Sequence, residues 1–122
     1  MYNLYLDDIR HPSMTYPHMK DGDWTVVKSY NSFVEIITQR GLPTMVSFDH
    51  DLADEHYDYR VKYSEYKEKT GMDCAKWLVN YCMDNNLKLP VWNVHSANPI
   101  GAANIYSYLS NFERIRDAQN IT

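Results

Sequence analysis

Short apolar runs alternate with longer segments of mixed character along this chain. Four runs are rich in β-branched and aromatic residues, which is typical of strands, and they cover residues 2–6, 24–28, 44–48 and 91–94. Residues 9–23 contain two prolines and no regular period, so we expect a long loop there. Elsewhere apolar residues recur at helical spacing, which predicts helices that begin near residues 29–31, 70 and 98.

Capping residues mark where each of these helices begins. Ser29 or Asn31 can cap the first helix, and Thr70 can cap the second. Asn98 is a strong cap for the last helix, because the Pro99 that follows it is favoured at a first helical position. The stop signals are Gly41, Pro43 and the pair Asn85-Asn86. The apolar faces of the last two helices comprise Ala75, Leu78, Val79, Cys82 and Met83, and Ile105, Tyr108, Leu109 and Phe112.

Strands that alternate with helices imply parallel strands joined by right-handed crossovers. We therefore expect an α/β fold, a small, open, doubly wound parallel sheet of about four strands, in a single domain over residues 1–122. A charged, tyrosine-rich insertion at about residues 52–69 interrupts the alternation, and Tyr59, Tyr63 and Tyr66 fall on one helical face. This insertion is either a solvated helix or loop, or a mobile lid that stacks aromatic rings on a ligand base.

Composition and charge narrow the range of partners. The formal charge is −4 and there is no run of Lys or Arg, which argues against binding long duplex nucleic acid through its backbone. No stretch approaches the roughly 20 apolar residues that cross a bilayer. Cys74 and Cys82 would lie about 12 Å apart on one helix, too far for a disulfide. We therefore expect free thiols and a cytoplasmic setting.

Two acidic clusters follow strands of the predicted sheet. Asp7 and Asp8 come after the first run, and Asp49 and Asp51 come after the third. Because the carboxyl ends of parallel strands face one crevice, the clusters can converge there. In an extended chain Asp49 and Asp51 would point the same way, with His50 opposed. Carboxylates suit hard cations, so we expect these four acids to hold magnesium or manganese, although Asp8 and Asp51 could also simply cap turns.

A second polar cluster, residues 95–99, follows the last strand. If Asn98 caps the helix, the backbone amides of Ile100 and Gly101 are free donors at a helix N-terminus, which is a typical phosphate site. His95 could donate to that phosphate or act as acid or base near neutral pH. A histidine at the end of a strand can also be purely structural.

Two further polar features have competing interpretations. Arg10, three residues beyond Asp7, could clamp a phosphate or pair with an acid. The segment Thr70-Gly71-x-Asp73 has a complete structural explanation, because Thr70 and Asp73 satisfy free amides and favour the helix dipole. We interpret that segment as a helix start.

Four motifs, taken together and in this order, resemble one protein family. They are Leu6-Asp7-Asp8-Ile9-Arg10-x-Pro12, Ser47-Phe48-Asp49-His50-Asp51-Leu52, Thr70-Gly71-x-Asp73 with Trp77-Leu78, and His95-Ser96-x-Asn98-Pro99-x-Gly101. They resemble the cyclic-phosphate-processing receiver-like domain family, a variant of the response-regulator receiver fold that is common in bacteria and phages. The resemblance extends over residues 4–105.

The resemblance implies a receiver- or flavodoxin-like sheet with a magnesium site. In ordinary receivers an acidic pair after the first strand and an aspartate after the third hold the ion, and Asp7, Asp8 and Asp49 correspond to these positions. Receivers also use a lysine after the last strand, but here residues 95–98 take that side, which argues against phosphorelay. The family's acidic motif is usually followed by glycine, where this chain has Ala53.

The residues suggest a cation and a phosphate site, and the resemblance implies a metal-assisted phosphoesterase that processes a cyclic phosphate on a nucleotide, a cyclic oligonucleotide or an RNA end. Asp49, His50 and His95 would then be catalytic. The expected phosphate contacts are Arg10, Ser96, Asn98, Ile100 and Gly101. An alternative is a non-catalytic module of phage type that sequesters a cyclic nucleotide signal. A third hypothesis, ranked last, is a receiver with Asp49 as phosphoacceptor.

Overall fold

The computed structural model describes residues 1–53, 56, 60, 62 and 69–119. Most of the predicted insertion at residues 52–69, including the proposed tyrosine face, therefore lies outside the described residues. In the described part of the chain, no helix is long and apolar enough to cross a lipid bilayer. The elements are, in order, β1 (Asn3–Leu6), α1 (Pro12–Thr15), η1 (Asp21–Asp23), β2 (Trp24–Val27), α2 (Tyr30–Arg40), β3 (Met45–Phe48), α4 (Gly71–Asp84), β4 (Val91–Val94) and α5 (Pro99–Gln119).

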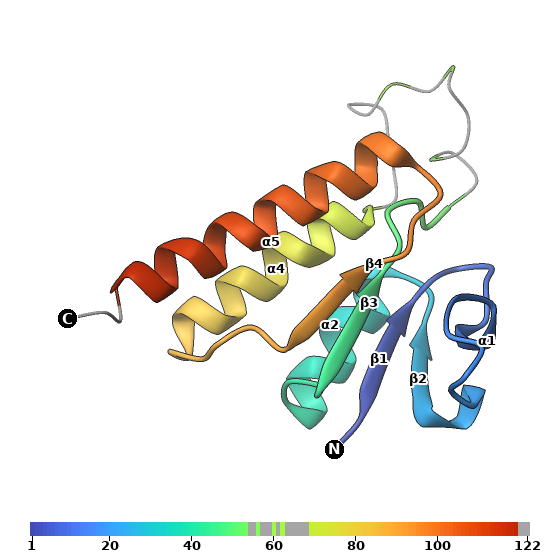
Figure 1. Cartoon of the computed structure of the whole chain (residues 1–122), viewed down its shortest axis with the longest axis horizontal. Helices are drawn as coiled ribbons and strands as arrows, with labels where there is room; N and C mark the ends of the chain where they lie inside the picture. The colour runs from blue at the N-terminus through green and yellow to red at the C-terminus, as the bar shows by residue number, and fades with distance from the viewer. Residues whose placement is uncertain (54–55, 57–59, 61, 63–68, 120–122) are drawn as a thin grey trace.

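The strands form one open parallel sheet in the order β2-β1-β3-β4 (Figure 1). Leu6 is paired with Val27 and Phe48, and Phe48 with Val94, so the last residues of all four strands are level. The predicted four-stranded, receiver-like α/β fold is confirmed. Each predicted strand and each predicted helix is present. The cap of α2 is Ser29, whose hydroxyl accepts a hydrogen bond from Ser32 N–H at 3.2 Å.

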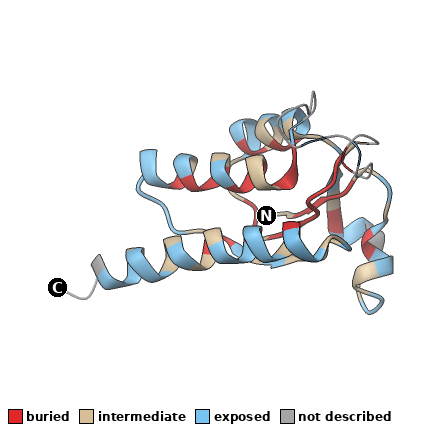
Figure 2. Cartoon of the chain, turned by 90° about the horizontal axis from the view of Figure 1, so that it is seen from above, coloured by how far each residue is buried: buried red, intermediate tan, exposed pale blue. Residues whose placement is uncertain are grey.

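The hydrophobic core lies between the sheet and the helices α2, α4 and α5. Phe33 of α2 contacts both the ring of Phe48 and that of Trp77 on α4, with ring centroids 5.8 and 6.1 Å apart. Helix α5 runs alongside α4 and next to β4, and it adds Ile105 and Leu109 to the same core (Figures 1 and 2). Cys74 and Cys82, predicted as free thiols, are both free and buried in this core.

The segment between β1 and β2 corrects one expectation from the sequence. Instead of a continuous loop over residues 9–23, the structure has the short helices α1 and η1. Pro12 occupies the first position of α1, where its fixed φ suits a helix. A four-residue helix is too short for periodicity to reveal. The segment brings Tyr16 over the second face of the sheet, which is the face opposite the core with α2, α4 and α5. There its ring stacks on Trp24 with centroids 5.0 Å apart.

The N-terminus of α4 packs directly against the end of β3. Gly71 N–H donates to the carbonyl oxygen of His50 at 2.7 Å. A Cβ atom at position 71 would overlap the carbonyl oxygen of Asp49, so only glycine allows this approach. Thr70 N–H donates to Asp73 Oδ2 at 2.8 Å, which confirms the predicted helix start. Helix α4 thereby fixes the backbone of the two residues that follow β3.

We expect Gly71→Ala to destabilise the protein strongly. The added methyl group would meet backbone atoms of Asp49 that cannot move without disturbing β3, and overpacking of this kind costs about 2 kcal/mol or more. Urea denaturation gives the change in the free energy of unfolding. Gly22→Ala is the matched control, because a Cβ there meets nothing within 4 Å, and it should change stability by less than about 0.5 kcal/mol. Equal effects of the two substitutions would contradict this packing.

Candidate functional site

Asp7, directly after β1, is a fully buried carboxylate with four hydrogen bonds. Oδ1 accepts from the backbone N–H groups of Ile9 and Arg10 at 2.9 and 2.8 Å. Oδ2 accepts from Arg10 Nη1 at 3.1 Å and from His95 Nε2 at 3.0 Å. Burial alone would raise the pKa of Asp7, but the bonds from His95 and Arg10 and the Ile9 amide outweigh it and lower the pKa to about 2. Asp7 is therefore ionised near neutral pH.

His95 lies directly after β4, and three neighbouring side chains contact its imidazole ring. Its ring stacks on Tyr5 with centroids 4.4 Å apart and an interplanar angle of 5°. Nε2 faces Asp7, and Nδ1 lies 2.7 Å from Ser47 Oγ. Because the ionised Asp7 can only accept, Nε2 carries a proton. In the neutral ring Nδ1 then accepts from the Ser47 hydroxyl, so this histidine orients Asp7.

A chain of hydrogen bonds extends from His95 across the second face of the sheet. Tyr16 Oη lies 2.8 Å from Ser47 Oγ, and Asn93 Nδ2 donates to Tyr16 Oη at 2.7 Å. Asn93 can only donate through its nitrogen, which directs the Tyr16 proton to Ser47 and the Ser47 proton to His95. None of these three residues was assigned a role from the sequence, although Ser47 is part of one of the four motifs. Serine and asparagine inside the apolar strands β3 and β4 were the available signal.

Asp49, directly after β3, carries an unsatisfied buried oxygen. Oδ1 accepts from the backbone N–H of His50 at 2.8 Å. Oδ2 is buried with no hydrogen-bond partner among the described residues, and Arg10 Nη1 lies 3.8 Å from it. Burial, followed by the charge of Asp7, raises the pKa of Asp49 to about 6, against the opposing effects of His95, the His50 amide and the Ser96 hydroxyl. A buried acceptor of this kind is costly unless something binds it.

Asp7, Asp8 and Asp49 together form an acidic cluster. One ligand oxygen from each lies within 4.8 Å of the others, as expected for side chains at level strand ends. Three carboxylates with an unsatisfied oxygen among them are a suitable ligand set for a divalent metal ion. The structure thus brings together three of the four acids that the sequence predicts as metal ligands.

Asp51 is not part of the acidic cluster. Its Oδ1 lies 2.7 Å from His50 Nδ1 and accepts from Asn98 Nδ2 at 3.3 Å. This corrects the expectation that Asp49 and Asp51 share one direction with His50 opposed. The strand ends at Phe48, and beyond it the alternation of an extended chain no longer applies. Asp51 instead links His50 to the N-terminus of α5.

At the predicted phosphate site, at the N-terminus of α5, one of the two backbone amides expected to be free is already hydrogen-bonded. Asn98 does cap α5, but its Oδ1 accepts from Gly101 N–H at 3.0 Å, so that amide is not a free donor. Gly101 has another role, because a Cβ there would overlap the ring of His50. Ser96 Oγ accepts from Asn98 N–H at 3.1 Å, and the Ile100 side chain is exposed.

Arg10 pairs with an acid, which is one of the two roles that the sequence left open, and its phosphate contact stays a prediction. Its guanidinium contacts Asp7 at 3.1 Å while its side chain remains 30% exposed. It therefore adds a positive charge at the border between the acidic cluster and solvent.

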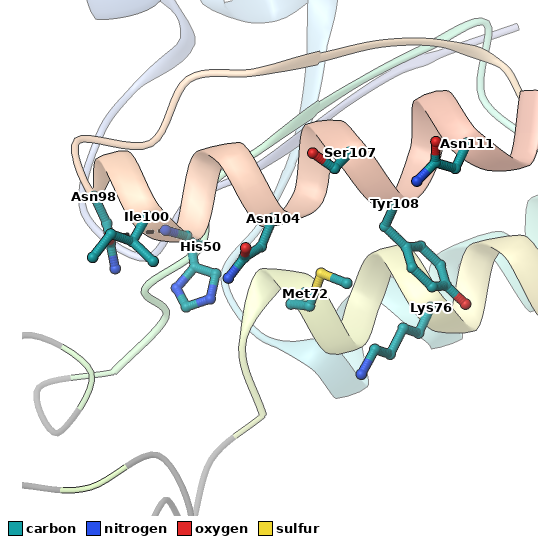
Figure 3. A pocket seen from close by; sticks show the side chains of 10 residues that line it. His50, Met72, Lys76, Asn98, Ile100, Asn104, Ser107, Tyr108 and Asn111 are labelled. Atoms are coloured by element: carbon teal, nitrogen blue, oxygen red, sulfur yellow. Dashed lines mark hydrogen bonds between the residues drawn. The ribbon is translucent and has the colours of Figure 1, made fainter.

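A groove of about 690 Å³ begins at His50, Asn98 and Gly101 and continues between α4 and α5 (Figure 3).

Comparison with family models gives one finding that agrees with this geometry. A model described as the cyclic-phosphate processing receiver domain matches residues 2–111. The matched range includes every residue of the site described above. The chain matched no curated protein and no solved structure.

Asp49→Asn should stabilise the metal-free protein near neutral pH. The folded state holds a proton on Asp49 up to a pKa of about 6, against an ordinary value of 3.8, so ionisation as the pH rises through this window lowers stability. The gap corresponds to about 3 kcal/mol, and we expect a gain of about 1–3 kcal/mol at pH 7 and little change below pH 4. Guanidinium denaturation in the presence of EDTA, at pH 7 and at pH 4, measures this change in the free energy of unfolding.

Asp7→Asn is the control, because it should lower the stability of the protein near neutral pH where Asp49→Asn should raise it. Its pKa of about 2 lies below the ordinary 3.8, so the ionised carboxylate contributes stability above about pH 4 that is lost as the pH falls towards 2. The substitution should cost about 2 kcal/mol or more at pH 7. If Asp49→Asn destabilised the protein as much as Asp7→Asn, the unsatisfied state of Asp49 would be refuted.

Proposed function

The chain belongs to the cyclic-phosphate processing receiver domain family, and from that premise we propose that it is a metal-assisted phosphoesterase. Its substrate class would be a cyclic phosphate on a nucleotide, a cyclic oligonucleotide or an RNA end. The buried Asp49 Oδ2 atom, without a hydrogen-bond partner among the described residues and beside two further acids, supports this most directly. Such an oxygen is what a cation would satisfy.

Asp7, Asp8 and Asp49 would hold a magnesium or manganese ion, because hard cations take carboxylate oxygens together with water and phosphate. When bound, such an ion polarises a phosphate and lowers the pKa of a coordinated water. The hydrogen bonds to Asp7 keep its carboxylate anionic at neutral pH, so it contributes negative charge to the cluster. The exposed part of Arg10 would attract the anionic substrate.

His50 is the better placed of the two acid/base candidates. When its Nδ1–H donates to Asp51 Oδ1, the neutral ring keeps its lone pair on Nε2, and the ring lines the groove. Both nitrogens of His95 are occupied by buried partners. We therefore assign His50 as the acid/base residue, and His95 as a positioning residue for Asp7.

In the proposed reaction a water oxygen bonds to phosphorus, and its proton passes to His50 Nε2. The bond from phosphorus to one ester oxygen of the ring then breaks, and His50 returns the proton to that oxygen. The products are a phosphate monoester and a free hydroxyl group. Asp51 and Asn98 would keep the imidazole oriented during both transfers.

Hydrolysis of nucleoside 2′,3′-cyclic phosphates tests this activity. We expect monophosphate with Mn²⁺, none with EDTA, and a loss of at least about 100-fold in Asp49→Asn, because the ion loses an anionic ligand. Asp84→Asn, at an exposed position near the end of α4, should keep full activity. Stoichiometric recovery of intact bound ligand would instead identify a sequestering module. The absence of both product and binding would refute both functions.

His50→Phe and His95→Phe should fail in different ways. His50→Phe removes the acid/base group and should lower kcat by about 100-fold or more, while Mn²⁺ still raises the melting temperature. His95→Phe keeps a ring against Tyr5 but removes the donor to Asp7, so it should weaken the Mn²⁺ response and recover activity at high Mn²⁺. Thermal shift and kcat measured over a Mn²⁺ titration separate the two. A His50→Phe variant with normal kcat would rule out the assigned role.

A further inference from the structure

The groove between α4 and α5 is largely unused by the chemistry proposed above. Figure 3 shows His50 and Asn98 at one end, beside the first turn of α5. From there Asn104, Ser107 and Asn111 follow one another along α5, while Met72 and Lys76 face them from α4. The groove therefore begins at the residue next to Asp49 and leads away from the acidic cluster.

We propose that this groove binds the nucleoside part of the substrate. The cyclic phosphate would then be carried by a nucleoside phosphate, either free or at the end of an RNA strand, and not by a simple sugar or polyol. This inference rests on the proposed function for the position of the phosphate, which would lie at the His50 end.

The α5 side of the groove presents hydrogen-bonding groups where a helix pair usually has apolar ones. Residues 104, 107, 108 and 111 have the spacing of one helical face, and three of them are Asn104, Ser107 and Asn111. An amide side chain offers both a donor and an acceptor, which matches the edge of a nucleobase. These side chains are exposed, and Asn111 Oδ1 accepts a hydrogen bond from Arg114 Nη2 at 2.7 Å on the same helix.

The remaining lining residues suit the flat face of a base and a phosphate. The Met72 thioether and the Tyr108 ring are the kinds of group against which bases pack. Lys76 supplies a positive charge, and no acidic residue is among the described residues that line the groove, although the protein has a net charge of −4. The lining thus favours an anionic ligand with aromatic parts.

The dimensions of the groove fit more than a phosphorylated sugar. Its volume of about 690 Å³ is within the usual range for small-molecule sites. Gly101 and Asn111 are ten residues apart on one helix, which is about 15 Å along the axis. With the phosphate at the His50 end, a nucleoside can extend along α5 and leave room for part of a neighbouring nucleotide.

Calorimetric titration of the full chain tests the groove without relying on catalysis. The probes are ribose 5-phosphate, adenosine 3′-monophosphate and a trinucleotide with a 3′-phosphate, each with EDTA and with Mn²⁺. We expect the mononucleotide to bind at least about 10-fold more tightly than ribose phosphate, because only the nucleotide reaches the amide face. Tighter binding of the trinucleotide would identify an RNA end as the source, and equal binding would identify the free nucleotide.

Two substitutions locate the binding. Asn104→Ala should weaken nucleotide binding by about 5-fold or more and leave ribose phosphate unchanged, because only the base reaches the amide. Lys76→Ala removes the positive charge of the groove and should weaken the binding of both ligands. Asn80→Ala, at an exposed position of α4 outside the groove, is the matched control and should have no effect. Equal affinity for ribose phosphate and the nucleotide, no nucleotide binding in either buffer, or normal binding in both variants would overturn the proposal.

The two proposals fail separately. Nucleotide binding that depends on Asn104, without any product in Mn²⁺, would refute the phosphoesterase and leave the groove assignment intact. Equal hydrolysis of glycerol 1,2-cyclic phosphate and adenosine 2′,3′-cyclic phosphate, unaffected by Asn104→Ala, would refute the groove and leave the phosphoesterase intact.

Discussion

The buried charge of Asp7 is the constraint on which the rest of the site depends. Four hydrogen bonds hold this carboxylate ionised, and its field then opposes ionisation of Asp49. Arg10 compensates only in part, because its guanidinium bonds to Asp7 and lies 3.8 Å from Asp49 Oδ2. Two acids in this arrangement are jointly stable as anions only with a further positive charge. The fold therefore keeps a site that a cation would stabilise.

The parallel sheet brings the two acids and His95 together directly at the ends of its strands. Because β1, β3 and β4 end level, the residues that follow them, Asp7, Asp49 and His95, meet without any long loop. Each is then fixed by a different neighbour. Asp7 is held by the turn that follows β1, His95 by the second face of the sheet, and the backbone of Asp49 by the close packing of Gly71.

The sequence was sufficient for features that depend on local pattern. Level strand ends follow from a parallel sheet, so the convergence of Asp7, Asp8 and Asp49 could be predicted. The direction of Asp51 could not, because it depends on how the chain turns after Phe48 under the packing of α4. The part played by Ser47 depends on Tyr16, thirty-one residues away, and no periodicity contains that contact. Local pattern thus gives the position of a polar group, whereas its partners depend on tertiary packing.

His50 connects the two sides of the site through one residue. Its backbone N–H binds Asp49 Oδ1, its carbonyl oxygen accepts from Gly71, and its ring packs against Gly101 and lines the groove. The ring has no space to move towards α5, since even a methyl group at Gly101 would overlap it. Asp51 restrains it from a second direction. A ligand in the groove would therefore meet a side chain whose position is set by the same backbone that carries the acidic cluster. In the proposed reaction this would fix the base relative to the cation before substrate arrives.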